Sequence, residues 1–324
     1  MIYKVLCSQE TEELRSRLEQ YLPGTAKIFY VIQNVVLGHL KGFEVIVDKW
    51  PDFNCILLRP RSKDEVLGYF RHTHICYGKS VSALKYFLQR PGLINWKEPI
   101  NFTGVPNDLI PVLTEVSKKH GGQLSSKESR FMYAWSKSYS PELPKLPEGM
   151  KLMPLKQEHA SEITKDWAGR GNRQDMESYF RSVIENFESS CLLDEDGRLV
   201  AYVCMHYNGS MAMVYVRPEN RDEGYFHILL SDLTRKILAK KQIAYGFIPV
   251  NDTSLIKLCR EIGFEWVPQG NMTWSCYTPR TLTVPKRAIS DLSEQSQNIS
   301  RPDQSVDEVY TGINSLLTSA IVYP

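Results

Sequence analysis

The chain has 324 residues, 42% of them hydrophobic and 23% charged, which is the composition of a globular protein with enough apolar material for two ordinary cores. A formal net charge of +2 excludes a general attraction to nucleic acid or to an acidic membrane, so any phosphate recognition must be local. The seven cysteines are scattered without C-x-x-C spacing, so we expect neither a metal site nor a disulfide framework, and a reducing compartment is favoured. We find no apolar run of the ~18–20 residues that a spanning helix needs, and no signal-peptide core at the N-terminus.

The first part of the chain has the pattern of a mixed α/β unit. Its expected elements are a helix at 10–21, strands at 43–48 and 54–58, and a helix at 80–89 that ends before Pro91-Gly92. Prolines and a glycine then interrupt residues 138–149, which predicts an extended linker between a first domain at 1–137 and a second at 150–280. From 281 to 324 polar residues dominate without periodicity, so we expect a disordered tail.

The second part of the chain alternates helices with strands. The expected elements are a strand at 151–155, helices at 157–168 and 173–187, a hairpin of strands 191–193 and 199–204 turning at Asp196-Gly197, a strand at 211–216, a helix after Gly224, a strand at 243–249, a helix at 252–262, and strands at 265–267 and 273–277. The helix after Gly224 carries Phe226, Leu233 and Ile237 on one stripe, as expected of a helix that packs on a sheet. This order predicts an α/β (α+β) fold with a mixed, partly parallel sheet.

The most informative segment runs from Val216 to Gly224, where a predicted strand passes into the start of a helix. Such a junction leaves backbone N–H groups unpaired and suits an anionic ligand such as a pyrophosphate. Arg221-x-x-Gly224 adds a cation, together with a residue that has no side chain where the backbone must come close. The residues expected to bind the ligand are Val216, Arg221, Asp222, Glu223, Gly224, Tyr225 and Phe226. The competing interpretation is a plain capped helix start, because carboxylates at Asp222 and Glu223 would compete with phosphate for the positive end of the helix.

A second helix start follows at Asn251-Asp252-Thr253-Ser254, and that helix closes with Gly263-Phe264. Together with the Arg-x-x-Gly segment, these residues resemble the GNAT acyltransferase superfamily, whose members bind acyl-CoA at the first site. The resemblance implies that Asn251 contacts the pantetheine arm, although counting back from Gly263-Phe264 puts Asp252 at the matching place. Either residue could instead be an ordinary helix N-cap.

Three stretches narrow the resemblance, namely residues 47–54 (VDKWPDFN), 93–97 (LINWK) and 167–172 (WAGRGN). They are similar to the glycine N-acyltransferase family. That resemblance implies a tandem fold in which a degenerate GNAT-like N-terminal half precedes an intact GNAT catalytic domain. It implies transfer of an acyl group from acyl-CoA, a co-substrate, to the amine of glycine, without a prosthetic group or a metal. It also implies a mitochondrial location, with the cytoplasm as the alternative. We expect no nucleic-acid or membrane partner, and a monomer.

The ammonium group of glycine must lose a proton before or during attack on the thioester, which requires a base. The family's Pro-Glu-x-Arg matches Pro218 to Arg221 and implies Glu219 in this role, with His206, near the end of a preceding strand, as the alternative. Since no catalytic Ser-His or Cys-His pair is recognisable, we expect direct attack in a ternary complex. Cys259 falls where many GNAT enzymes carry the tyrosine that protonates the departing thiolate, so the resemblance implies a proton donor there. The alternative is that Cys259 is a buried structural cysteine.

Asn172 and Arg173 follow the Trp167 motif, and we expect them to line the acceptor pocket, where a cation can hold the carboxylate of glycine. Arg170 stands where the family pattern has glycine, which keeps open another small amine acceptor such as glutamine. The acidic pair Asp222-Glu223 keeps open a different interpretation, an acyl-CoA-binding module with little catalysis.

Overall fold

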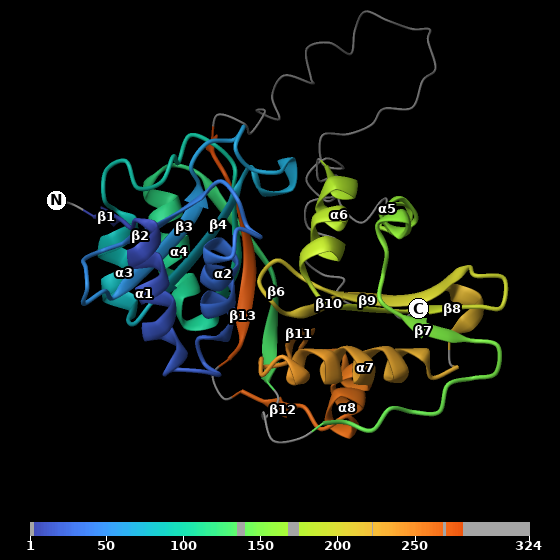
Figure 1. Ribbon diagram of the computed structural model, residues 1–324. Coiled ribbons are helices and arrows are strands. Elements are labelled where there is room, and N and C mark those ends of the chain that lie inside the picture. Colours follow the sequence, from blue (N-terminus) through green and yellow to red (C-terminus); the bar gives the residue numbers. More distant parts are fainter. Residues whose placement is uncertain (1–2, 135–139, 168–174, 222, 268–269, 281–324) are drawn as a thin grey trace, which may run out of the picture.

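A computed structural model describes residues 3–134, 140–167, 175–221, 223–267 and 270–280, with residues 127–134 given by their backbone. These residues form helices packed on both faces of one long sheet (Figure 1). The predicted α/β class with a mixed sheet is confirmed. The predicted tail at 281–324 lies outside the described residues.

The first half of the chain carries six strands and four helices, with two short 3₁₀ turns, among the residues described. Its strands are β1 (Lys4–Val5), β2 (Phe43–Val47), β3 (Cys55–Pro60), β4 (Thr73–Gly78), β5 (Ile100–Pro106) and β6 (Gln123–Ala134). Its helices are α1 (Ser8–Glu19), α2 (Ala26–Val36), α3 (Val81–Leu88) and α4 (Ile110–Lys119), and its 3₁₀ turns are η1 (Gly68–Phe70) and η2 (Asn107–Leu109).

The second half supplies the remaining elements. Its strands are β7 (Lys151–Met153), β8 (Ser189–Leu193), β9 (Leu199–Met205), β10 (Met211–Val216), β11 (Tyr245–Pro249), β12 (Glu265–Trp266) and β13 (Met272–Thr278). Its helices are α5 (Ala160–Asp166), α6 (Met176–Asn186), α7 (Tyr225–Ala239) and α8 (Thr253–Glu261), and its 3₁₀ turns are η3 (Gln157–His159) and η4 (Pro218–Asn220). None of the helices in the described ranges combines the length and the apolar character needed to cross a membrane.

The two halves exchange strands. The sheet runs in the order β1-β2-β3-β4-β5-β13-β6-β11-β10-β9-β8-β7, with β12 also paired to β6. The last strand of the chain, β13, therefore lies between β5 and β6 of the first half, and β6 of the first half pairs with β11 of the second. The sheet continues across the predicted linker at 138–149, within which residues 140–149 form neither helix nor strand.

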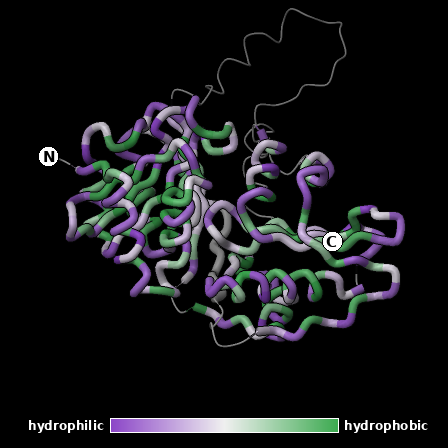
Figure 2. Tube along the Cα trace, viewed as in Figure 1, coloured by the Kyte–Doolittle hydropathy of each residue, from purple (hydrophilic) through white to green (hydrophobic). Residues whose placement is uncertain are grey.

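The helices divide the structure into layers with apolar residues between them. Helices α1 and α2 of the first half and α5 and α6 of the second share one apolar cluster that is continuous between the halves. On the opposite faces, α3 and α4 cover the first half, and α7 and α8 cover the second. Figure 2 shows the hydrophobic residues concentrated along the strands and the inner faces of the helices.

Parallel pairing is confined to two places among the described strands, β4 with β5 and β10 with β11. All other ladders among the described strands are antiparallel, as at β8, β9 and β10. Each parallel pair is followed by helices on one face, α3 and α4 in the first half and α7 and α8 in the second (Figure 1). Strand β10 of the second pair leads into the segment from Val216 to Gly224, which the sequence predicts to bind an anionic ligand.

Candidate active site

Strands β10 and β11 separate after a single pairing. They pair in parallel only at Met211 and Gly246, and no further partners follow toward their carboxyl ends. We call the gap beyond this pairing the wedge. It holds a small cavity of about 30 Å³ lined by Met211, Ala212, Val214, Leu230, Gly246, Phe247, Ile248, Leu255, Cys259 and Phe264. Because the strands are parallel, their carboxyl ends lie at one edge of the sheet, and α7 and α8 both begin there.

Strand β10 is irregular beside the wedge. Ala212 pairs with Cys204 and Tyr215 with Tyr202, so Met213 and Val214 together face the single β9 residue Val203. Met213 has a φ of 51°, in the left-handed region that costs a residue other than glycine roughly 1–2 kcal/mol. A bulge of this kind leaves one residue without a partner in the ladder and re-aims its backbone groups. No sequence pattern predicts this bulge, because methionine is not a residue type that favours a positive φ.

The start of α7 presents unpaired donors. Gly224 has a φ of 73° and is the N-cap of α7, with no side chain capping the helix. The backbone N–H groups of Gly224 and Tyr225 have no acceptor among the described residues. The side chain of Arg221, a partly exposed residue, likewise makes no hydrogen bond or ion pair within the described ranges, and its backbone N–H donates to Pro218. Unpaired backbone donors beside a cation are the features expected of an anion-binding helix start.

The other residues predicted to bind the ligand lie around this helix start. Val216 ends β10 and packs against the α7 and α8 side, where Tyr225 and Phe226 are buried. Glu223 is exposed, and Asp222 lies outside the described residues. The assignment of all seven residues to ligand binding stays a prediction.

At the start of α8, the structure shows which of Asn251 and Asp252 caps the helix, and their proposed contact with a ligand stays a prediction. Asp252 is the N-cap, and its carboxylate accepts a hydrogen bond from the Leu255 backbone N–H at 3.0 Å. Asn251 is exposed beside it, at the same edge of the sheet as the start of α7. Asp252 therefore performs the ordinary capping function, and Asn251 is the residue with its side chain still available to a ligand.

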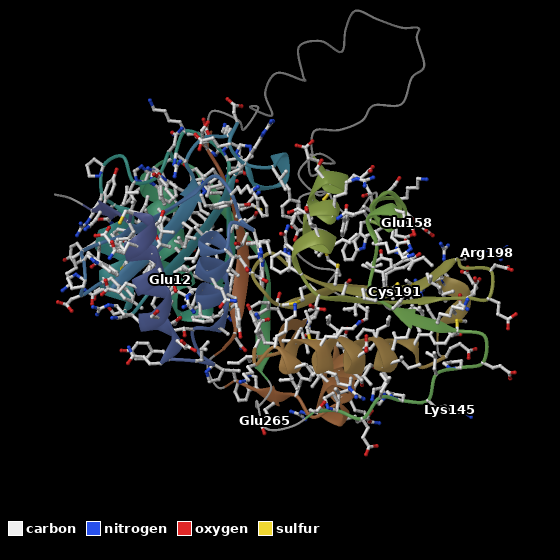
Figure 3. The ribbon with its side chains drawn as sticks, in the orientation of Figure 1. Glu12, Lys145, Glu158, Cys191, Arg198 and Glu265 are labelled. Atoms are coloured by element: carbon white, nitrogen blue, oxygen red, sulfur yellow. The ribbon has the colours of Figure 1, made fainter. Side chains whose placement is uncertain are left out.

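Glu219 lies at the rim of the wedge and not inside it. It sits in η4, directly after β10, where its side chain is exposed. It lines a polar cleft of about 520 Å³ together with Arg217, Asn220 and Glu162. In that cleft Arg217 is held by an ion pair with Glu162 and donates to the Leu199 carbonyl at 2.5 Å. Arg198, which also lines this cleft, is labelled in Figure 3 at the end of the molecule away from the first half.

Cys259 lines the wedge from α8, and burial raises the pKa of its thiol to about 12. An ordinary thiol has a pKa near ~8.5. Cys259 is therefore a weaker acid than a departing CoA thiol, and it is poorly suited to protonate the thiolate. Its geometry fits a structural cysteine in the wall of the wedge.

His206 follows β9 on the opposite face of the sheet from α7 and α8. Its Nδ1 lies 2.5 Å from the Tyr179 hydroxyl and accepts the Tyr207 backbone N–H at 3.0 Å. Since the backbone N–H can only donate, Nδ1 carries no proton, and the neutral ring has its proton on Nε2, which lies 3.4 Å from the Tyr69 hydroxyl. Both ring nitrogens thus have partners, an arrangement that suits a positioning residue better than the alternative base.

Comparison with known proteins identifies the family to which the chain belongs. Residues 2–188 match the family described as aralkyl acyl-CoA:amino acid N-acyltransferase, and residues 191–274 match the FR47-like protein family. The chain belongs to the aralkyl acyl-CoA:amino acid N-acyltransferase family. It is therefore an enzyme, an acyl-CoA:amino acid N-acyltransferase.

Individual relatives align along nearly their whole length. Glycine N-acyltransferase of Rattus norvegicus is 24% identical over 295 residues, which span 85% of this chain and 99% of the relative. Glycine N-acyltransferase-like protein 2 of Homo sapiens is 24% identical over 295 residues, spanning 84% of this chain and 97% of the relative.

A solved structure shares the fold of the whole described chain. An X-ray structure of a Drosophila protein superposes with a TM-score of 0.73 and 15% identity, covering 86% of this chain and 99% of that one. A GCN5-related N-acetyltransferase from Sphaerobacter thermophilus gives a TM-score of 0.47 with 12% identity, covering 85% of this chain and 94% of that one. The predicted GNAT fold and the predicted family are both confirmed.

The predicted acceptor residues of this acyltransferase, Asn172 and Arg173, lie outside the described residues, as does Arg170. The described chain resumes at Asp175, which precedes α6 with a φ of 57°. Its carboxylate accepts the Gly68 backbone N–H at 3.0 Å, so that α6 is tied to the first half. Sequence reasoning missed this contact and the tyrosines beside it, because they join segments about a hundred residues apart and no local pattern marks such a pairing.

Proposed function

We propose that this acyltransferase moves the acyl group of an acyl-CoA to the amine of glycine, giving an N-acylglycine and free CoA. The names of the relatives from rat and mouse support glycine as the acceptor. The observation that carries the proposal is the convergence of two helix starts on the open edge of the wedge. Among the described residues, N–H groups at the start of α7 and the side chain of Arg221 have no partner there. Such a site matches the pyrophosphate of CoA in charge and in hydrogen bonding.

From that anchor the pantetheine arm would follow the wedge. Beyond Met211 and Gly246 the facing edges of β10 and β11 have no partner strand between them, so they offer backbone donors and acceptors to an extended chain. The cavity of about 30 Å³ between them matches the volume of one water molecule, so the strands must move apart to admit the arm.

The bulge at Met213 and Val214 is our proposed site for the thioester carbonyl. A backbone N–H released from the ladder there would stabilise the negative charge that develops on the carbonyl oxygen. The amine nitrogen then attacks the thioester carbon, the C–S bond breaks, and the sulfur leaves as the CoA thiolate, which takes its proton from solvent. No covalent acyl-enzyme forms in this scheme.

Glu219 is the proposed acceptor of the amine proton, on the strength of the family's Pro-Glu-x-Arg. The geometry sets a condition on this role. At ~3.3 Å per residue along an extended strand, Val216 lies ~10 Å beyond Met213, and Glu219 lies farther still. Glu219 can therefore act directly only on an amine near the rim of the wedge, and on one at the bulge only through water in the polar cleft.

The proposal is tested by free-thiol release from aromatic, short-chain and long-chain acyl-CoAs, with glycine, with glutamine and with no acceptor. Glycine-dependent release supports the proposal and identifies the acyl class. Thiol release with glutamine alone would assign glutamine, and not glycine, as the acceptor. CoA binding without thiol release would indicate an acyl-CoA-binding module with little catalysis. The mitochondrial location implied by the resemblance stays a prediction, tested by imaging the tagged full chain in cells.

A further inference from the structure

Two tyrosines from different halves of the chain stack against each other beside the site. Tyr69, in η1 of the first half, lies parallel to Tyr179 on α6, with ring centroids 3.8 Å apart and an interplanar angle of 7°. Tyr179 is 1% exposed and Tyr69 8% exposed. Phe70 meets the edge of this stack, 5.7 Å from Tyr179. The three rings therefore form one aromatic cluster that joins the two halves of the chain.

Hydrogen bonds hold both rings in place. Tyr179 donates its hydroxyl proton to His206 Nδ1 at 2.5 Å, and burial raises the pKa of Tyr179 well above its usual range, so the hydroxyl stays protonated. The Nε2 side of the same imidazole faces the Tyr69 hydroxyl at 3.4 Å. His206 therefore bridges the stack at one end, and the Asp175–Gly68 hydrogen bond of 3.0 Å fixes the first turn of α6 against η1 at the other.

The stack lies on the side of the sheet from which an acceptor would come. Met213 of the bulge belongs to the same apolar cluster as Tyr69 and Tyr179, whereas Val214 belongs to the cluster under α7 and α8. On β9, Cys204 pairs with Ala212 next to the bulge, and His206 follows two residues later. If acyl-CoA enters from the side of α7 and α8, an amine must reach the thioester from the opposite side, where α6 and η1 meet.

From this placement we infer that Tyr69 and Tyr179 form the wall of the acceptor pocket and restrict the acceptor to the size of glycine. The inference rests on the proposed function and deepens it, because it assigns acceptor choice to a residue of the first half. Two stacked, buried and hydrogen-bonded rings cannot rotate away without breaking these contacts. A larger amino acid would therefore need space that they occupy, and a single methylene in such a pocket changes kcat/KM by roughly 10–200-fold.

The test compares kcat/KM for glycine, alanine and glutamine in Tyr69→Ala, which removes the ring, and in Tyr69→Phe, which keeps it. Tyr69→Ala should raise the alanine-to-glycine ratio of kcat/KM by about tenfold or more, and Tyr69→Phe should leave that ratio within about twofold of wild type. Tyr86→Ala, at a tyrosine of α3 that is 73% exposed, is the matched control and should not change the ratio.

A folded Tyr69→Ala enzyme with the wild-type ratio would overturn the inference while leaving the proposed function intact. If Tyr69→Ala does not fold, Tyr179→Leu tests the same wall from α6 with less loss of volume, and an unchanged ratio there is equally decisive. A wild-type enzyme that releases CoA with no amine at all would instead overturn the proposed function, and the acceptor wall with it.

Discussion

Lys27 is buried inside the first half, and it forms no ion pair with the part of the chain that the structure describes. Its side chain is 3% exposed, and its ammonium donates to the backbone carbonyls of Thr103 and Gly104, the latter at 2.9 Å. Desolvation lowers its pKa from 10.5 to about 7. Between these two pKa values the unfolded chain binds a proton at Lys27 that the folded chain does not. The contribution of Lys27 to the free energy of unfolding therefore rises with pH from about 7 to 10.5, and it is lost as the pH falls back toward 7.

Replacing Lys27 by Met should remove this dependence. We expect the difference in unfolding free energy, wild type minus Lys27→Met, to rise between pH 7 and pH 9 by up to about 1.4 kcal/mol per pH unit. Denaturant titrations of both proteins across this range measure it, and taking the difference cancels the titration of the buried cysteines. A flat difference would show that Lys27 keeps its ordinary pKa in the folded protein.

Glu219 is the residue on which the proposed proton transfer depends. Glu219→Gln should lower turnover by about 10²–10⁴-fold, the usual contribution of a positioned base, while the dissociation constant for acyl-CoA changes little. Steady-state kinetics with a separate binding measurement checks both, and Glu195→Gln, at an exposed glutamate of the neighbouring hairpin, serves as the control. Unchanged turnover would remove Glu219 from the mechanism.

At the scale of one element, the start of α7 depends on the left-handed conformation of Gly224. A Cβ at this position would meet no atom within 4 Å, so Gly224→Ala strains only the backbone, by ~1–2 kcal/mol. Relief of that strain would move the N–H groups proposed to bind phosphate. We expect CoA to bind about tenfold more weakly by calorimetry, since 1.4 kcal/mol corresponds to a factor of about ten.

Gly121→Ala is the matched control for this change. Gly121 also has a positive φ, 77°, with no atom within 4 Å of a new Cβ, and it lies at the end of α4 in the first half. Both substitutions should lower stability by a similar amount, whereas only Gly224→Ala should weaken CoA binding. Equal CoA affinity in the two variants would contradict the proposed phosphate site.

The elements that the sequence predicted are those with local signals. The helix after Gly224 and the strand at 211–216 lie where the pattern placed them, because amphipathic spacing and glycine mark their ends. Helix α2 was missed, since residues 26–36 are a short, mostly apolar run, and such a run cannot be told from a buried strand by its pattern alone. The bulge at Met213 was missed as well, because it follows from pairing with β9 and not from its own residue type.

At the scale of the whole molecule, the exchange of β6 and β13 makes each half depend on the other. The resemblance predicted two GNAT-like halves, but the pairing of β13 between β5 and β6 joins segments separated by well over a hundred residues, beyond the reach of any local pattern. A fragment ending at 149 contains β5 and β6 without the strand between them, and β6 also loses its partner β11. The fragment therefore exposes unpaired strand edges.

We therefore expect residues 1–149, expressed alone, to be insoluble or unfolded by circular dichroism and size-exclusion chromatography. Co-expression with residues 150–324 should restore a soluble complex, because it supplies β13 and the rest of the shared apolar cluster. A cooperatively folded 1–149 fragment would show that the first half is an independent domain with its boundary at the predicted linker.

Transfer of the acyl group to the amine of glycine is the central prediction for this enzyme. The most direct measurement is mass spectrometry of the products formed from an acyl-CoA and isotopically labelled glycine by the purified full chain. We predict a labelled N-acylglycine in an amount equal to the CoA released. Free carboxylic acid without label, or unchanged acyl-CoA in the presence of every amine tested, would contradict it.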